Sequence, residues 1–168
     1  MKNPFIKFLI IAIIGFSLSN CSQSNTKAND KSQSIVSTSY DSVLAREYGA
    51  DQYRMKKYVI AFLKRGPNRS LDKDKANELQ MAHMNNIDRM AEEGKLVLAG
   101  PFFGNDDLRG IYIFNVESIE EAKALTNSDP AIKAGSLVME LKEWYGSAAL
   151  MAINDLHKSL SASSISDE

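Results

Sequence analysis

The sequence contains little from which a metal centre or a disulfide could be built. It has one cysteine, Cys21, and two histidines, His83 and His157. One thiol cannot form an internal disulfide, and this set is too small for the usual zinc centre. A glycine-rich phosphate loop is also missing, because Gly104-Asn105-Asp106-Asp107 is typical of a turn. We therefore expect neither a bound metal nor a cofactor, and we expect His157 to be solvated.

The chain also lacks an excess of positive charge. It carries 20 Lys and Arg against 21 Asp and Glu, a formal net charge of -1. Binding of a polyanion needs clustered positive potential, and here the basic residues are scattered among acidic ones. Nucleic acid is therefore not expected as a partner. Lys64, Arg65 and Arg69 could attract an anionic substrate, although charges of a solvated loop are the ordinary explanation.

The amino terminus is typical of an exported lipoprotein. Lysines flank the start of an apolar run, Phe8–Leu18, which has the length of a signal peptide and is too short for a comfortable membrane span. Cys21 follows Leu18-Ser19-Asn20, which resembles a lipobox, although Asn20 replaces the usual small residue. We expect a lipoprotein signal peptide over residues 1–20 and acylation of Cys21. The alternative is a plain secretory signal followed by an incidental cysteine.

The rest of the chain divides by composition into three parts. Residues 21–40 are polar and cannot offset their ordering entropy, so we expect a flexible tether. A folded domain is expected over 41–160 and a polar tail over 161–168. Acyl chains on Cys21 would anchor this domain to the cell envelope, facing the periplasm. Ser22, rather than Asp, follows the cysteine and indicates the outer membrane by analogy.

Hydrophobic periodicity in the domain predicts an α+β fold. Strands are expected at 57–64, 95–101, 109–116 and 136–144, and helices at 72–93 and from Ser118 onward. A short helix capped by Asp41 and an added C-terminal helix over 147–158, capped by Ser147, flank them. The order β-α-β-β-α-β is the ferredoxin-like arrangement, in which two helices cover one face of a four-stranded antiparallel sheet.

The other face of this sheet is expected to be covered as well. A sheet face that is simply wet does not account for so many large aromatic side chains on the strands. These side chains are Tyr58, Phe62, Tyr112, Phe114 and Trp144. A second copy of the chain, packed face to face as a homodimer, is the simplest hypothesis. A small-molecule cavity is its alternative or companion.

His83 is a candidate site residue on the predicted helix 72–93. It lies four residues after Leu79 and four before Ile87, within the inward-facing apolar stripe. A neutral imidazole there needs partners for both nitrogens, which the helix backbone cannot supply. A core histidine that bonds a carbonyl or carboxylate explains this position as well as a functional histidine does.

Asp129 is a second candidate, although its local sequence has an ordinary explanation. Asp129-Pro130 is typical of the N-cap and first residue of a one-turn helix, and Gly135 is placed to end it. The two interpretations are compatible, because a carboxylate has two oxygens and can cap a backbone N–H while it orients an imidazole.

Two segments together resemble the YCII-related (YciI-like) family. They are Ala82-His83-Met84 running on to Glu92-Glu93-Gly94-Lys95-Leu96-Val97-Leu98-Ala99-Gly100-Pro101, and Asp129-Pro130 followed by Ala134-Gly135. The similarity spans residues 56–146. It implies a dimeric α+β barrel in which His83 and Asp129 converge as a dyad at a pocket. Gly100 and Pro101 would then form part of the pocket wall.

The resemblance implies a small-molecule enzyme that uses this dyad for general acid/base proton transfer, of the isomerisation or elimination type, on an unknown substrate. An Asp held against one nitrogen of His83 would fix the tautomer and raise the basicity of the other nitrogen. The alternative is a non-catalytic lipoprotein module that binds a small ligand or serves a stress response, because fold does not determine function.

Overall fold

The structure, a computed structural model, describes residues 39–160 and 162. The expected signal peptide (1–20), acylated Cys21, most of the tether (21–40) and most of the tail (161–168) lie outside these residues and stay predictions. Within the described part of the chain, no helix is both long enough and apolar enough to cross a membrane.

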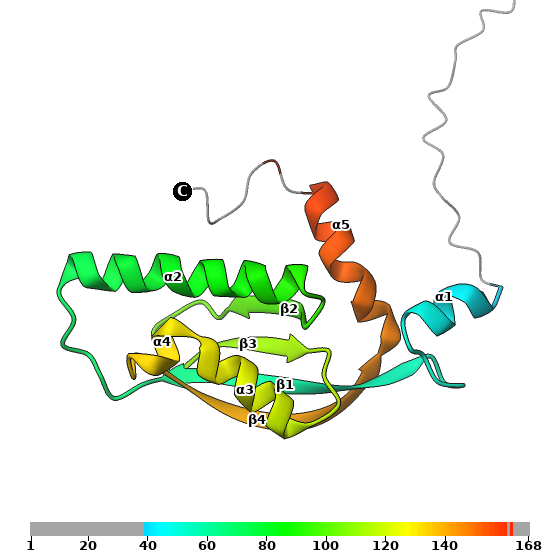
Figure 1. The fold of residues 1–168 in the computed structure, drawn as a ribbon, viewed down its shortest axis with the longest axis horizontal. Helices are drawn as coiled ribbons and strands as arrows, with labels where there is room; N and C mark the ends of the chain where they lie inside the picture. The colour runs from blue at the N-terminus through cyan, green and yellow to red at the C-terminus, as the bar shows by residue number, and fades with distance from the viewer. Residues whose placement is uncertain (1–38, 161, 163–168) are drawn as a thin grey trace, which may run out of the picture. The chain divides into compact units, whose positions relative to one another are not determined.

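The described residues form an α+β domain with a four-stranded antiparallel sheet of order β2-β3-β1-β4, as the sequence predicts (Figure 1). The strands are β1 (Met55–Arg65), β2 (Leu96–Pro101), β3 (Leu108–Phe114) and β4 (Leu137–Ser147). The helices are α1 (Ser42–Glu47), α2 (Lys73–Glu92), α3 (Ile119–Ser128), α4 (Pro130–Lys133), the 3-10 turn η1 (Ala148–Ala152) and α5 (Ile153–Leu160). Helices α2 and α3 cover one face of the sheet.

Short polar side chains begin these helices where the sequence predicts. Asp41 accepts hydrogen bonds from backbone N–H groups of α1, and Asp72 does the same for α2. Ser118 caps α3 and Asp129 caps α4. Helix α2 ends at Glu92, and Gly94 follows its C-cap Glu93 with a φ of 68°, a left-handed conformation that favours glycine.

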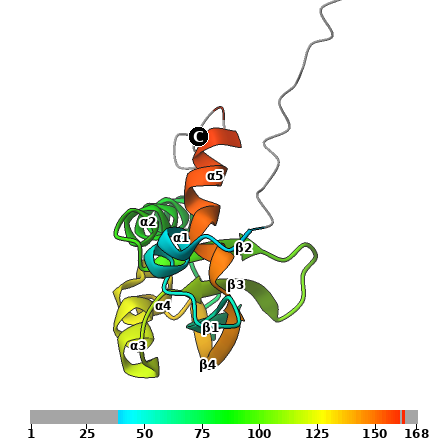
Figure 2. The same ribbon diagram turned by 90° about the vertical axis from the view of Figure 1, so that its right-hand side faces the viewer.

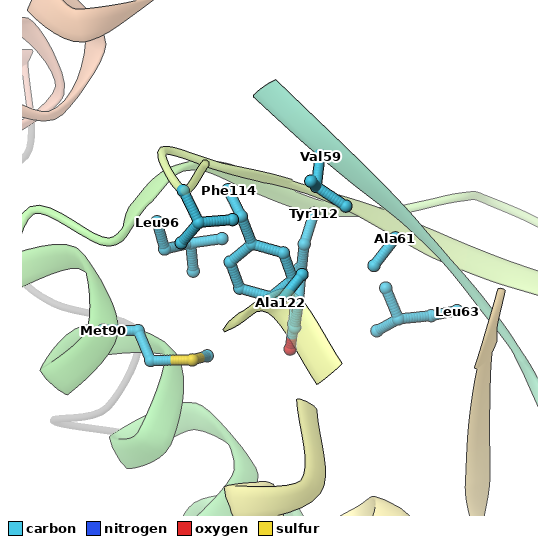
Figure 3. Packing of buried hydrophobic residues seen from close by; sticks show 9 residues of the cluster. Val59, Ala61, Leu63, Met90, Leu96, Tyr112, Phe114 and Ala122 are labelled. Atoms are coloured by element: carbon cyan, nitrogen blue, oxygen red, sulfur yellow. The ribbon is translucent and has the colours of Figure 1, made fainter. Parts of the chain in front are cut away.

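The main hydrophobic core lies between the sheet and α2 and α3 (Figure 3). It is built from alternate residues of the strands together with one residue from each helix, Met90 of α2 and Ala122 of α3. Tyr112 and Phe114 belong to this core, with exposures of 2% and 0%. The prediction that they lie on the opposite face was wrong, because the alternation of a strand shows which residues share a face but not which face a helix covers.

The opposite face is only partly covered. Tyr58 packs there against the 3-10 turn η1, which contributes Leu150 and Met151. The predicted helix 147–158 is divided in the structure: Ser147 caps the 3-10 turn η1, and α5 follows it. Beyond its start, α5 extends away from the sheet (Figures 1 and 2). Phe62, Val138 and Trp144 define the remainder of the face, which no helix of the described residues covers; we call it the open sheet face.

The outer strand β4 carries charges that pair with β1. Lys57 lies 2.5 Å from Glu143, and Lys64 lies 2.5 Å from Glu140. Both pairs are roughly half exposed, so solvent screens them and neither contributes much to the free energy of unfolding. These pairs make the edge strand β4 charged and add little to the stability of the sheet.

A β-bulge in β3 changes the direction of one side chain. Leu63 of β1 pairs with Gly110, but the next residue, Lys64, pairs with Leu108, so Arg109 has no partner in the ladder. Such an extra residue bends a strand and re-aims its side chain. Gly110 is needed beside the bulge, because a Cβ there would lie 2.6 Å from the carbonyl oxygen of Gly100.

We expect Gly110→Ala to lower the free energy of unfolding by about 1–3 kcal/mol, because the added methyl group must displace the backbone of β2. Gly100→Ala is the matched control, since no atom lies within 4 Å of a Cβ at that position. Its effect should stay below about 1 kcal/mol. Urea unfolding followed by circular dichroism measures both, and equal effects of the two variants would contradict the proposed contact.

Candidate active site

The structure brings His83 and Asp129 together. Nδ1 of His83 lies 3.0 Å from Oδ1 and 2.9 Å from Oδ2 of Asp129. Asp129 has an exposure of 0% and His83 of 8%, so water does not screen the interaction. The two residues are 46 positions apart in the chain, and α2 and the start of α4 place them side by side.

The carboxylate of Asp129 is surrounded by donors. The backbone N–H of Ala131 donates to Oδ1 over 2.8 Å, as expected for the N-cap of α4. The side-chain amide of Asn86 donates to Oδ2 over 3.3 Å. Asn86 is itself oriented by Arg89, which donates to its Oδ1 over 2.9 Å. A buried acceptor with several N–H donors is held in one orientation, and losing one of these partners costs about 1–3 kcal/mol.

Tyr112 occupies the other side of the imidazole. Its hydroxyl lies 3.2 Å from Nε2 of His83, and the two rings are stacked at an interplanar angle of 22°. Because Nδ1 faces a carboxylate, it carries the proton, and Nε2 accepts from the Tyr112 hydroxyl. Burial, and then the charge of Asp129, raise the pKa of Tyr112 above its usual value, which keeps the phenol protonated.

Sequence reasoning missed Tyr112 as a site residue. It was counted among the aromatic residues of the opposite face, whereas its hydroxyl points from β3 toward the helices (Figure 3). The available signal was the strand register. Residues 110, 112 and 114 share one face of β3. The second ring nitrogen of His83, on the helix that covers this face, requires a hydrogen-bond partner, and a tyrosine hydroxyl from β3 can supply it.

A pocket of about 250 Å³ adjoins this group of residues. Its wall includes Leu79, one helical turn before His83, and Ala131, whose N–H is bound by Asp129. His83 and Asp129 themselves lie behind that wall. The pocket therefore borders the dyad without containing it.

Gly100 and Pro101, the other predicted wall residues, lie apart from this pocket. They pair with Ile111 and Gly110 of β3, at the end of β2. The register places Pro101 on the same face of the sheet as Tyr112 and Gly100 on the opposite face. The structure therefore does not bring Gly100 to the dyad.

The rest of the described chain offers few other groups for chemistry. His157 is exposed on α5. Within residues 39–160 and 162, no three His, Cys, Asp or Glu side chains are grouped as metal ligands would be. A second pocket of about 430 Å³ lies between α3 and β4, and its mostly apolar wall includes Thr126, Ile132 and Met139 but no histidine or carboxylate.

The chain is similar to a protein family, to a curated protein and to a solved structure. Residues 57–145 match the YCII-related domain. The uncharacterized protein YjpA of Bacillus subtilis is 35% identical over 72 residues, which cover 42% of this chain and 82% of that protein. Among solved structures, 5-chloro-2-hydroxyhydroquinone dehydrochlorinase of Burkholderia phenoliruptrix is similar with a TM-score of 0.39 and 21% identity, over 53% of this chain and 93% of the other.

Proposed function

We propose that this chain, which belongs to the YCII-related domain family, is a small-molecule enzyme that transfers protons by general acid/base catalysis. The observation that carries the proposal is the hydrogen-bonded series Asp129–His83–Tyr112, in which each ring nitrogen of the histidine has its own partner. An imidazole held between a carboxylate and a phenol is arranged to accept and return a proton.

The division of roles follows from the hydrogen bonds. Asp129 accepts from Nδ1 of His83, which fixes the tautomer and orients Nε2 toward Tyr112. In this proposal the substrate meets the Tyr112 hydroxyl on the side away from Nε2. Its oxygen takes a proton from the substrate as its own proton passes to Nε2, so that no free phenolate accumulates. The reverse transfer delivers the proton to another atom of the substrate, as an isomerisation or an elimination requires.

A non-catalytic module that binds a small ligand, or serves a stress response, is the second candidate. One observation favours it: His83 is 8% exposed, both its nitrogens already have partners, and it lies behind the pocket wall. The same contacts would serve a purely structural role in joining α2 to α4. The two candidates differ in whether a bound molecule exchanges protons with the protein.

The open sheet face supports a homodimer. Trp144 and Val138 are exposed by 38% and 42%, and Phe62 lies between them and the centre of the sheet. Glu140 and Lys142 share this face, opposite Phe62 and Ile60, so a partner that covers the exposed apolar side chains would also have to pair these charges. A second copy related by twofold symmetry would place the same face against itself and form the dimeric α+β barrel.

The sequence of the amino terminus supports a location on the cell envelope. Acylation of Cys21 would hold the protein on the cell envelope, facing the periplasm and, given Ser22, on the outer membrane. The polar segment 21–40 would separate the domain from the lipid surface, since about 20 residues of flexible chain span roughly 25 Å.

The enzyme proposal predicts exchange of carbon-bound protons. Incubated in D2O with a panel of pyruvate, oxaloacetate and phenylpyruvate, the protein should accelerate deuterium incorporation beside the ketone of at least one member, as measured by proton NMR. His83→Gln should slow this exchange by about 100-fold or more, because the base is lost. Tyr112→Phe should slow it as well.

His157→Gln, on the exposed face of α5, is the matched histidine control and should retain full exchange. Exchange that is equal in wild type and His83→Gln would end the catalytic proposal. A His83→Gln protein that unfolds more easily, together with a wild type that exchanges no proton in the panel, would instead favour the structural role of a binding module.

The homodimer predicts a sedimenting species of twice the chain mass at micromolar concentration. Phe62→Glu should convert it to the monomer, because a carboxylate would be buried in the open sheet face. Phe103→Glu is the control, since Phe103 is fully exposed, at 101%, in the β2–β3 loop. A wild-type monomer at high micromolar concentration would refute the dimer.

Lipid anchoring predicts that the mature protein partitions into the membrane fraction and incorporates a labelled fatty acid. Cys21→Ser should abolish the label and release the protein into the soluble fraction, because no acyl chain can be attached. Ser22→Ala is a neighbouring control that keeps the cysteine. Membrane association that survives Cys21→Ser would disprove anchoring through this residue.

A further inference from the structure

We propose that the pocket beneath the first half of α2 binds the carboxylate of a small, partly apolar molecule. Two arginines, Arg69 and Arg109, line it from different parts of the chain. Carboxylic acids would then be the substrate class of the proposed enzyme. Calling the bound molecule a substrate rests on the proposed function, whereas its binding to the pocket does not.

Arg109 reaches the pocket because of the β-bulge. In a regular strand it would point to the face opposite Gly110, away from α2. As the extra residue of the bulge it lines the pocket together with Leu79 and Gln80 of α2. Its guanidinium donates to the carbonyl oxygens of Gly104 and Asp106, over 3.1 and 3.4 Å, which holds the side chain in place.

Arg69 comes from the connection between β1 and α2, which is fastened to the start of β4. Gly66 and Asn68 donate backbone N–H groups to Ser136 and Gly135, over 2.9 and 3.0 Å. The guanidinium of Arg69 then donates to the carbonyl oxygen of Ser136 over 3.2 Å. Gly66 permits this contact, because a Cβ there would lie 2.2 Å from the carbonyl oxygen of Gly135.

The hydrogen-bond partners found for the guanidiniums of Arg69 and Arg109 are uncharged groups. Within residues 39–160 and 162, neither forms an ion pair, and the pocket wall contains no acidic side chain. The hydrogen bonds described for both guanidiniums go to neutral carbonyl groups. Each guanidinium has five N–H donors, so donors remain for an anion. Planar paired donors match a carboxylate.

The rest of the wall selects the size and polarity of the ligand. Leu79, Leu137 and Ala131 supply an apolar surface beside the arginines. A volume of about 250 Å³ is below the range of about 300–1,000 Å³ usual for drug-sized ligands. The site therefore fits a compact carboxylic acid with a hydrocarbon body, whereas a nucleotide is too large and an inorganic anion leaves the apolar wall unused.

The position of the site links it to Asp129. Ala131 contributes to the pocket wall and donates its N–H to the Asp129 carboxylate. Leu79 precedes His83 by one turn of α2. A carboxylate fixed by the arginines would thus position the remainder of the molecule at the border of the Asp129–His83–Tyr112 series.

Benzoate is a suitable probe, and benzamide is its neutral counterpart of the same shape. Titration of the isotopically labelled protein with benzoate should shift the amide signals of Ala131 and Ser136 in a saturable manner. Arg69→Gln and Arg109→Gln should each weaken benzoate about tenfold or more, as loss of a charged hydrogen bond does. Benzamide should bind weakly to all of them. Arg46→Gln, an exposed arginine of α1, is the matched control and should leave affinity unchanged.

The subsite would be overturned if both pocket variants kept the benzoate affinity of the wild type, or if benzamide bound as tightly as benzoate. It would also be overturned if the amide shifts were confined to other surfaces or did not saturate with benzoate concentration. If Arg109→Gln fails to fold, Arg69→Gln in the exposed loop decides. His83→Gln separates the two proposals, because it should retain benzoate binding while it loses proton exchange. Arginine-dependent benzoate binding in a protein that exchanges no proton would leave the subsite standing and remove the enzyme.

Discussion

The architecture around the site depends on one buried carboxylate. Asp129 has no exposed surface, and a charge in that position is tolerated only when donors surround it. The donors come from His83 and Asn86 of α2 and from the first turn of α4. This one group therefore fixes how α2 lies relative to α4, and it leaves the second nitrogen of the imidazole facing the sheet.

Much of the fold was predictable, because local chemistry and tertiary structure agree. Caps at Asp41, Ser118 and Asp129 begin helices in both the prediction and the structure, and the alternation of Leu137, Met139 and Leu141 matches the core face of β4. The pairing of His83 with Asp129 came from the family resemblance. Periodicity alone left each of them with an ordinary structural explanation.

What could not be predicted depends on contacts between distant segments. Alternation in β3 does not show that Tyr112 faces the helices. The hydrogen bond of its hydroxyl to His83 depends on the position of α2, which the sequence of β3 does not contain. The bulge at Arg109 arises because two residues of β3 lie opposite one step of β1. It depends on the pairing of the two strands and cannot be recognised in the sequence of either one. The pocket lined by Arg69 and Arg109 could not be predicted either, because it forms only when distant segments pack together. In the sequence, both arginines have the surroundings of ordinary solvated residues.

The paired charges along β4 have a consequence beyond this domain. An outer strand exposes unsatisfied backbone groups that can template the addition of a strand from another molecule. In β4, Glu140 and Lys142 alternate with Met139, Leu141 and then Glu143, and Glu140 lies 3.1 Å from Lys142 and 2.5 Å from Lys64. An incoming strand would have to desolvate these ions. The edge thereby resists the addition of a strand from another copy of the chain.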